Sequence, residues 1–473
     1  MGQANHDQVP ILMVPFPAQS HLNQLLQFSC LISSYCGISV HFIASAIHNR
    51  QTKSRINGLN PQDIAKINFH DLPIPPFVSP PPNPNSSNKF PAQLQPCWDA
   101  SMNLRKPFSE YLHEISEKCK RVIVVHDIMM ASVVEDVASI HNAESYAFNV
   151  FSAFYLASFA TEAKGKPYPI PQHPKERINI PSFEDCLTDE FSSFEALQYK
   201  PRRHRSGNIH NTCRLLEGPY LDILASEDIV KKRKSWAIGP IFPAKLLSSQ
   251  RQSNKYLAWL DKHGPKSVMY VAFGTTVSLS DEQIKELALG LEQSKVKFIW
   301  SLRDADKGDV FDAAEVRRPQ LPQGFEERVE GVGMVVRDWA PQPEILAHPS
   351  IGGFLMPCGW SSCIESISMG VPIAAWPMLG DQPRTAVLIT DILKIGFVVR
   401  EWAKRKEIVK ASRIENVVRI LMASEEGDQM RKRAEEFAAT VRMANQPGGV
   451  SRLELDSFIA HITRPNNIVV SKI

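Results

Sequence analysis

The chain has 473 residues, of which 43% are apolar and 22% charged, and its formal net charge is +3. A chain of this length is too long for one hydrophobic core, so two domains of similar size are expected. The small net charge and the scattered basic residues exclude a dedicated nucleic-acid-binding protein, and no apolar run is long enough to span a membrane.

The N-terminal residues MGQANHDQVP are polar and lead directly into a predicted strand, unlike a secretory signal. The eight cysteines of the chain show no CxxC spacing or regular pairing, which indicates free thiols in a reducing compartment and no zinc site. We therefore expect a cytoplasmic protein without a bound metal.

The first apolar run, VPILMVPFP at 9–17, is nearly continuous, as in a buried strand of a parallel sheet. Apolar residues at helical spacing follow it, and ISVHFIAS at 38–45 returns to strand character. These segments form a predicted βαβ unit. RVIVVHD at 121–127 and ESYAFNV at 144–150 are predicted to extend the same sheet.

Two proline-rich segments, 72–96 and 164–186, are unsuited to helices or central strands. Long ordered loops of this kind often frame a ligand site, although a mobile surface loop is the alternative. Trp98 and the aromatic residues of 146–155 are candidates for the walls of such a site, with packing in the core as the alternative.

A second series of alternating elements begins near residue 240. SVMYVAFG at 267–274 predicts a strand, and DEQIKELALGLEQS at 281–294 predicts a helix with an apolar stripe. Further strands are predicted in VKFIWSLR, VGMVVRDWA, IGGFLMP and VPIAAWPM. The predicted fold class is therefore α/β, with two doubly wound Rossmann-like domains that face a cleft. The expected bounds are 1–240 for the N-terminal domain, 241–255 for the linker, 256–450 for the C-terminal domain and 451–473 for a segment that returns to the N-terminal domain.

Ligands of doubly wound sheets bind beyond the carboxyl ends of the strands. This rule places around one cleft His21, Asp127, Thr275, Thr276 and the turn 357–362. An imidazole such as His21 can remove a proton from a hydroxyl group near neutral pH, and a carboxylate such as Asp127 can fix its tautomer. Considered alone, His21 is as well explained as a helix-capping residue and Asp127 as a structural one.

The turn within GGFLMPCGWSSC, residues 352–363, joins a predicted strand to a predicted helix. The first N–H groups of such a helix and its positive end form a natural anion site. Pro357 lies in this turn and has no N–H to donate. The sequence therefore predicts either a phosphate site with a missing donor or the remnant of such a site.

The segment WAPQPEILAHPSIGGFLMPCGWSSCIESISMGVPIAAWPMLGDQ, residues 339–382, closely resembles the signature box of the plant family 1 UDP-dependent glycosyltransferases. The resemblance extends over nearly the whole chain, through PFPAQSHLNQ, NTCRLLEGPYLD, WAIGP and WLDKHGPKSVMYVAFGTT. ESISMGVPIAAWPM and DQPRTAVLIT are most similar to the zeatin O-glycosyltransferase branch. The resemblance implies a GT-B fold, in which the N-terminal domain binds the acceptor and the C-terminal domain binds a nucleotide sugar.

By this resemblance, the C-terminal domain holds a UDP-sugar as co-substrate, and no cofactor or metal is implied. Trp339 would stack on the uracil ring, and Gln342 and Glu365 would hydrogen-bond the ribose. The remaining implied donor contacts are Thr275, Thr276, Gly359, Trp360, Ser361 and Ser362 around the diphosphate, and Asp381 and Gln382 at the sugar hydroxyl groups.

The resemblance also implies the catalytic pair. His21 would be the base that deprotonates the acceptor hydroxyl group, and Asp127 would orient it. The acceptor would then displace UDP in line and invert an α-linked donor to a β-glycoside. The helix N-terminus and nearby hydroxyl groups would stabilise the departing diphosphate.

Three residues depart from the family pattern: Pro357 replaces a His, Ser361 replaces the usual Asn, and Ser20 replaces the usual Gly. The family His contacts the diphosphate, and proline cannot supply that hydrogen bond, which is worth roughly 1.5–3 kcal/mol. Two functions are therefore considered. The favoured function is an inverting, monomeric glycosyltransferase that moves a sugar from a UDP-sugar, with UDP-glucose preferred, to a phenolic, cytokinin-like or alkaloid metabolite. The alternative is a UDP-sugar-independent isomerase, cyclase or binding protein on the same fold.

Overall fold

The computed structural model describes residues 8–56, 58–165, 168, 178–227, 233–242, 254–312 and 317–465. The strands of its N-terminal half are β1 (Val9–Val14), β2 (Ile38–Ser45), β3 (Ile67–Leu72), β4 (Val122–Asp127), β5 (Ala143–Asn149), β6 (Gly207–His210) and β7 (Lys234–Ala237). They form one parallel sheet in the order β3-β2-β1-β4-β5-β6-β7.

The C-terminal half has a second parallel sheet. Its strands are β8 (Val268–Ala272), β9 (Lys297–Ser301), β10 (Gly333–Val336), β11 (Ile351–Met356), β12 (Ile373–Ala375) and β13 (Gly396–Val398). They lie in the order β10-β9-β8-β11-β12-β13. The strand order reverses beside β1 in the first sheet and beside β8 in the second, as in doubly wound folds.

Helices connect the strands of both halves. The first eight are α1 (Gln19–Ile32), α2 (Ala46–Ser54), α3 (Pro61–Ile64), α4 (Gln95–Ser101), α5 (Arg105–Lys118), α6 (Ala153–Glu162), α7 (Asp189–Leu197) and α8 (Arg214–Glu227). The later ones are α9 (Lys255–Leu260), α10 (Asp281–Ser294), α11 (Phe325–Arg328), α12 (Gln342–Leu346), α13 (Trp360–Met369), α14 (Gln382–Val387), α15 (Ala411–Ala423), α16 (Glu425–Asn445) and α17 (Val450–Ile462). No helix in the described part of the chain combines the length and the apolarity needed to cross a membrane.

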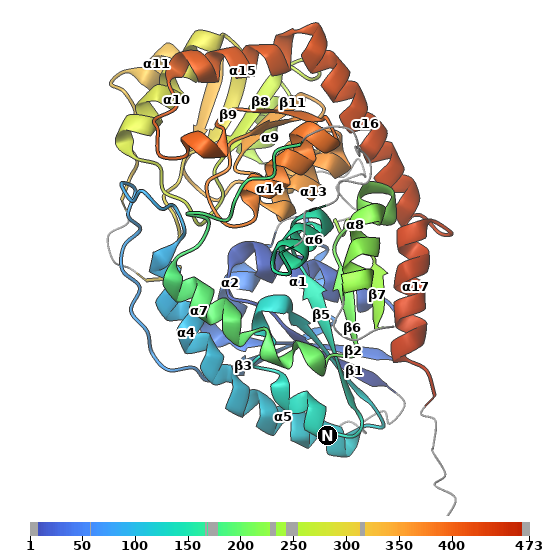
Figure 1. Ribbon diagram of the computed structural model, residues 1–473. Helices are drawn as coiled ribbons and strands as arrows, with labels where there is room; N and C mark the ends of the chain where they lie inside the picture. The colour runs from blue at the N-terminus through green and yellow to red at the C-terminus, as the bar shows by residue number, and fades with distance from the viewer. Residues whose placement is uncertain are drawn as a thin grey trace, which may run out of the picture.

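Figure 1 shows the two sheets as the centres of two halves, with α1, α6, α13 and α14 near the level where the halves meet. Helix α6 contacts α14 across this boundary. The predicted α/β class with two doubly wound units is therefore confirmed. Of the expected linker 241–255, residues 243–253 lie outside the described residues.

Local sequence explains several element bounds. All six residues of β4 are buried, which agrees with the apolar run Val122–Val125 that forms most of the strand. Helix α10 has the predicted bounds, because the Ser280 side chain accepts a hydrogen bond from the Gln283 N–H at its start and Lys295 adopts a left-handed conformation at its end. The strands β3, β6, β7 and β13 were not predicted, since they are short or half-exposed.

The last described helix returns to the first half of the molecule. Figure 1 shows α16 and α17 running down one side, so that α17 lies beside β7. Leu455, Phe458 and Ile462 of α17 pack into the core beneath the N-terminal sheet. The Trp236 indole N–H also donates to the Ser457 hydroxyl at 3.3 Å.

Helix α6 begins on a buried carboxylate from a distant part of the chain. Glu217, at a kink in α8, accepts hydrogen bonds from the Ala153 N–H at 3.0 Å and the Phe154 N–H at 2.8 Å. Its burial raises the pKa of the carboxyl group to about 7. This contact fixes the start of the helix that carries Tyr155 into the cavity described below.

Glu217→Ala is expected to lower the free energy of unfolding by roughly 2–3 kcal/mol, because two buried N–H groups lose their acceptor. Chemical denaturation at neutral pH measures the change. The control is Asp222→Ala on the same helix, where an exposed ion pair with Arg214 is lost and a change under about 1 kcal/mol is expected. Equal, small changes in both variants would contradict a structural role for Glu217.

Candidate active site

One cavity lies between the two halves and is lined by the carboxyl ends of strands from both sheets. Every predicted site residue except Asp127 contributes to its wall. The N-terminal half contributes His21. The C-terminal half contributes Thr275, Thr276, Trp339, Gln342, Gly359, Trp360, Ser361, Ser362, Glu365, Asp381 and Gln382. The rule that ligands bind beyond the strand ends therefore located the cavity correctly.

His21 and Asp127 form a direct pair. His21 lies in the first turn of α1, and its Nδ1 is 2.8 Å from Oδ2 of Asp127 at the end of β4. Asp127 is fully buried, and its Oδ1 accepts a hydrogen bond from the Met129 N–H at 2.9 Å. Because the carboxylate holds Nδ1, the proton is retained there and Nε2 carries the lone pair. This arrangement suits a general base.

Two aromatic rings pack against the imidazole of His21. The ring centroids of Phe16 and Phe151 lie 5.1 and 5.7 Å from that of His21, both in edge-on geometry. Ser20, exposed in the same turn of α1, does not displace His21 from Asp127. The His21–Asp127 pair is thus held in place by packing as well as by hydrogen bonding.

The cavity wall near His21 is largely aromatic. Trp98, Phe151 and Tyr155 line it, which favours the binding-site interpretation for these three residues. Tyr146 and Phe148, by contrast, belong to the core of the N-terminal sheet. Of the proline-rich segment 72–96, Phe90 and Pro91 reach the cavity. Of the other proline-rich segment, residues 166–167 and 169–177 lie outside the described residues, and none of its described residues lines the cavity.

Gln342 joins two of the predicted donor residues. Its Nε2 donates to Oε2 of Glu365 at 2.7 Å and to the Ser362 hydroxyl at 3.0 Å. Burial raises the pKa of Glu365 to about 7. These side chains lie where α12 and α13 meet, and they form one polar cluster on the cavity wall.

The turn before α13 keeps the form of an anion site. Strand β11 ends at Met356 and α13 begins at Trp360, so Pro357 lies in the connection and interrupts neither element. No side chain caps the helix, and Ser361 and Ser362 lie in its first turn beside the cavity. Trp360 is buried and its indole N–H donates to the Asn211 carbonyl of the N-terminal half at 3.0 Å. The indole N–H of Trp360 is therefore used in a contact between the two halves.

Asp381 and Gln382 lie at the start of α14. Burial raises the pKa of Asp381 to about 6, while the Trp360 N–H and the Thr385 hydroxyl act in the opposite direction. Oε1 of Gln382 accepts hydrogen bonds from the N–H groups of Met378 and Leu379 at 2.9 and 3.1 Å. Only the Nε2 end of Gln382 is therefore available to a ligand.

Some residues of the cavity carried no sequence signal. Arg55 and Arg303 both line it and lie over the Trp339 ring. Glu195 also lines it, with a pKa raised by burial. Arg55 and Glu195 lie in no motif, and Arg303 ends the predicted strand VKFIWSLR without having been singled out as a site residue. Among the described residues, no cluster of three His, Cys, Asp or Glu side chains could hold a metal ion.

Comparisons with known proteins agree with this geometry. Residues 7–243 match the family profile "Glycosyltransferase, N-terminal domain", and residues 243–407 match "UDP-glucoronosyl and UDP-glucosyl transferase". Zeatin O-glucosyltransferase of Phaseolus lunatus is 49% identical over 459 residues, which cover 97% of each chain. Zeatin O-xylosyltransferase of Phaseolus vulgaris is 48% identical over 98% of this chain and 100% of that protein.

The fold has close counterparts among solved structures. A UGT transferase from Siraitia grosvenorii, solved in complex with UDP, is 27% identical, with a TM-score of 0.74. The alignment covers 97% of this chain and 100% of that chain. The predicted GT-B arrangement is confirmed by this match.

Proposed function

Because the chain belongs to the plant family 1 UDP-dependent glycosyltransferases, we propose that it transfers a sugar from a UDP-sugar to a hydroxyl group of a small plant metabolite, with His21 as the base and Asp127 as its positioning partner. The observation that carries the proposal is the 2.8 Å contact between these two side chains at the wall of the cavity. The donor residues inferred from the resemblance line the same cavity.

The proposed donor is UDP-glucose, with UDP-xylose as the second choice. The two relatives described above are named as a zeatin glucosyltransferase and a zeatin xylosyltransferase, at nearly equal identity. For the acceptor we propose a flat, hydroxylated molecule such as zeatin or a plant phenol. The aromatic wall formed by Trp98, Phe151 and Tyr155 suits a planar acceptor.

In the proposed mechanism, Nε2 of His21 takes the proton of the acceptor hydroxyl as its oxygen attacks the anomeric carbon. The bond from that carbon to the diphosphate oxygen breaks at the same time, and UDP leaves with the electron pair. Asp127 stabilises the imidazolium that forms. Thr275, Thr276 and the N-terminal N–H groups of α13 would stabilise the charge on the departing diphosphate.

One observation favours the second candidate function, an acid–base reaction without a UDP-sugar. Pro357 lines the cavity at the turn where the family has a His that contacts the diphosphate. The His21–Asp127 pair is intact, so proton transfer on a bound metabolite does not depend on the donor site. An isomerase, a cyclase or a binding protein would retain this pair and the aromatic wall.

A panel assay tests both candidates. The protein is incubated with zeatin, plant phenols and alkaloids, with UDP-glucose, with UDP-xylose and with neither donor. A product heavier by one hexosyl or pentosyl group, absent without donor, supports the glycosyltransferase. A product of unchanged mass that forms without donor supports the alternative and would overturn the proposed transferase if no sugar adduct appears.

The raised pKa of Asp381 predicts a pH dependence of donor binding. Below pH 6 the carboxyl group becomes protonated and loses its charge, so the KM for UDP-glucose is expected to rise about tenfold between pH 7 and pH 5. Asp381→Asn should give a high KM without this transition. The pKa of Glu365, about 7, adds a separate transition that Glu365→Gln should remove. A KM for wild type that is constant from pH 5 to pH 7 would contradict the role of Asp381.

A further inference from the structure

Arg55 brings a positive charge from the N-terminal half to the aromatic platform of the C-terminal half. It follows directly after α2, whereas Trp339 follows β10. The Arg55 guanidinium carbon lies 4.5 Å from the centroid of the Trp339 ring, and both side chains line the cavity. A guanidinium group at this distance is in direct contact with the face of the ring.

Asp306 holds this guanidinium in place. Both Asp306 oxygens bond it, with Nη2 of Arg55 at 3.0 Å from Oδ1, and the two side chains are only 11% and 9% exposed. Nη1 also donates to Oε1 of Gln19 in the first turn of α1 at 2.8 Å. A bidentate, largely buried pair of this kind is strong and specific in geometry. Arg55 is therefore bonded to both halves of the molecule.

Arg303 adds a second guanidinium group beside the same ring. Its Nη2 lies 3.1 Å from the same Asp306 Oδ1, and its guanidinium carbon lies 5.3 Å from the Trp339 centroid. An aromatic base stacks at about 3.5 Å from its partner, so it cannot fit between Arg55 and the ring.

From this geometry we propose that Arg55 is an ionic latch over the nucleobase end of the donor site. Its guanidinium group covers one face of Trp339 and has to swing away before a uracil ring can stack on that face. The inference rests on the proposed function, since it takes Trp339 as the platform for the nucleobase. Arg55 thereby sets the affinity for the donor from the acceptor half of the protein.

The latch also reaches the diphosphate end of the site. The Asp306 N–H donates to the Thr275 carbonyl at 2.7 Å, and Gln93 Nε2 lies 3.4 Å from the carbonyls of both Thr276 and Asp306. A shift of the Asp306 loop on release of Arg55 would therefore be transmitted to the backbone of the residues that we assign to the diphosphate.

Calorimetric titration with uridine and with UDP tests the latch. In Arg55→Ala the Kd of both ligands is expected to fall roughly 3- to 30-fold, because the contact between the cation and the ring no longer competes with the base. The direction of the change in Kd distinguishes the latch from a simple charge effect. Removing a positive charge near the diphosphate would by electrostatics alone weaken UDP binding and leave uridine unaffected.

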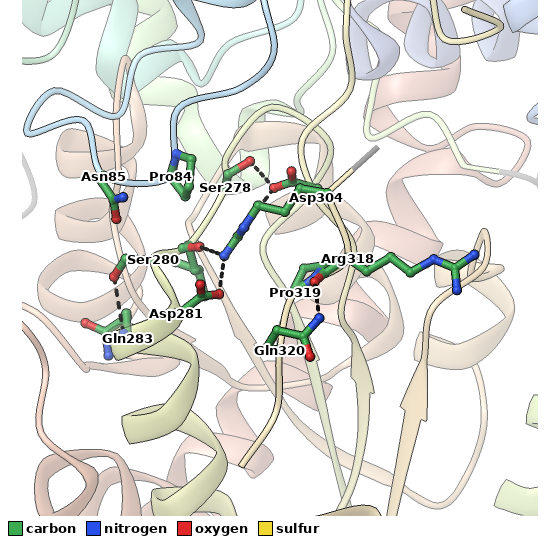
Figure 2. Close-up of polar contacts among 12 residues, drawn as sticks. Pro84, Asn85, Ser278, Ser280, Asp281, Gln283, Asp304, Arg318, Pro319 and Gln320 are labelled. Atoms are coloured by element: carbon green, nitrogen blue, oxygen red, sulfur yellow. Dashed lines mark hydrogen bonds and ion pairs between the residues drawn. The ribbon is translucent and has the colours of Figure 1, made fainter. Parts of the chain in front are cut away.

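The matched control is Arg317→Ala. The Arg317 guanidinium group lies 3.3 Å from Asp304 and 2.5 Å from Asp281. Figure 2 shows the positions of these two carboxylates. Asp304 follows the same strand, β9, as Asp306, but Arg317 has no contact with Trp339 and does not line the cavity. Its removal is expected to change the Kd of uridine by less than about twofold.

Asp306→Asn is a second, independent variant that keeps Arg55 but weakens the ion pair that holds it. Like Arg55→Ala, it is expected to lower the Kd of uridine. Equal or weaker uridine binding in both Arg55→Ala and Asp306→Asn would overturn the latch. Sugar transfer from UDP-glucose is measured on the same proteins. If the proteins transfer sugar but neither variant binds uridine more tightly than wild type, the latch is wrong and the proposed function stands. If the variants bind uridine more tightly but no protein transfers sugar, the proposed function is wrong and the latch stands.

Discussion

Replacing His21 by alanine is expected to lower kcat by roughly 10²–10⁴-fold, the usual contribution of a positioned general base. The His21 side chain is only 12% exposed, but its hydrogen bond is made to a residue that Met129 also holds, so the fold should tolerate the change. Initial rates at saturating UDP-glucose and acceptor measure the loss, and a thermal melt verifies the fold. A variant with near-normal kcat would remove His21 from the mechanism.

Asp127→Asn separates positioning from catalysis. Because Asp127 acts through the imidazole, its substitution should lower kcat while the KM values stay close to those of wild type. In the double variant with His21→Ala, the loss should be no greater than in His21→Ala alone, since the carboxylate then has nothing to orient. Additive losses, or unfolding of Asp127→Asn, would assign Asp127 a structural role instead.

The proximity of His21 and Asp127 was predictable because it follows from a topological rule, whereas their catalytic role remains a proposal drawn from the family resemblance. His21 and Asp127 are 106 positions apart in sequence, yet β1 and β4 are adjacent parallel strands with Val14 beside His126. Residues just beyond the carboxyl ends of two such strands must lie close together. The same rule, applied to β8 and β11, brought Thr275 and the α13 turn to one cavity.

Contacts between the two halves could not be predicted in this way. The indole N–H of Trp360 reaches the Asn211 carbonyl, and Arg55 reaches Asp306, only because of the relative orientation of the two sheets. No periodicity or local motif encodes that orientation. Strand β3 was missed for a different reason: three of its six residues are half-buried or exposed polar residues, so it lacks the continuous apolar pattern of a central strand.

Restoring the family residues at the α13 turn is expected to have the second-largest effect. Pro357→His combined with Ser361→Asn should lower the Kd of UDP about 10- to 150-fold, which corresponds to one regained hydrogen bond to a charged group. Both positions line the cavity, and neither lies within β11. The new side chains can therefore point toward the diphosphate without a change in the sheet.

Pro357→Ala is the matched control for this repair, because it returns the backbone N–H without an imidazole and should recover only part of the gain. A glycosyltransferase repaired in this way should gain donor affinity and rate. An enzyme with the second candidate function, an acid–base reaction without a UDP-sugar, should gain UDP binding while that reaction changes little. Equal UDP affinity in wild type and the double variant would show that the donor site is not weakened at this turn.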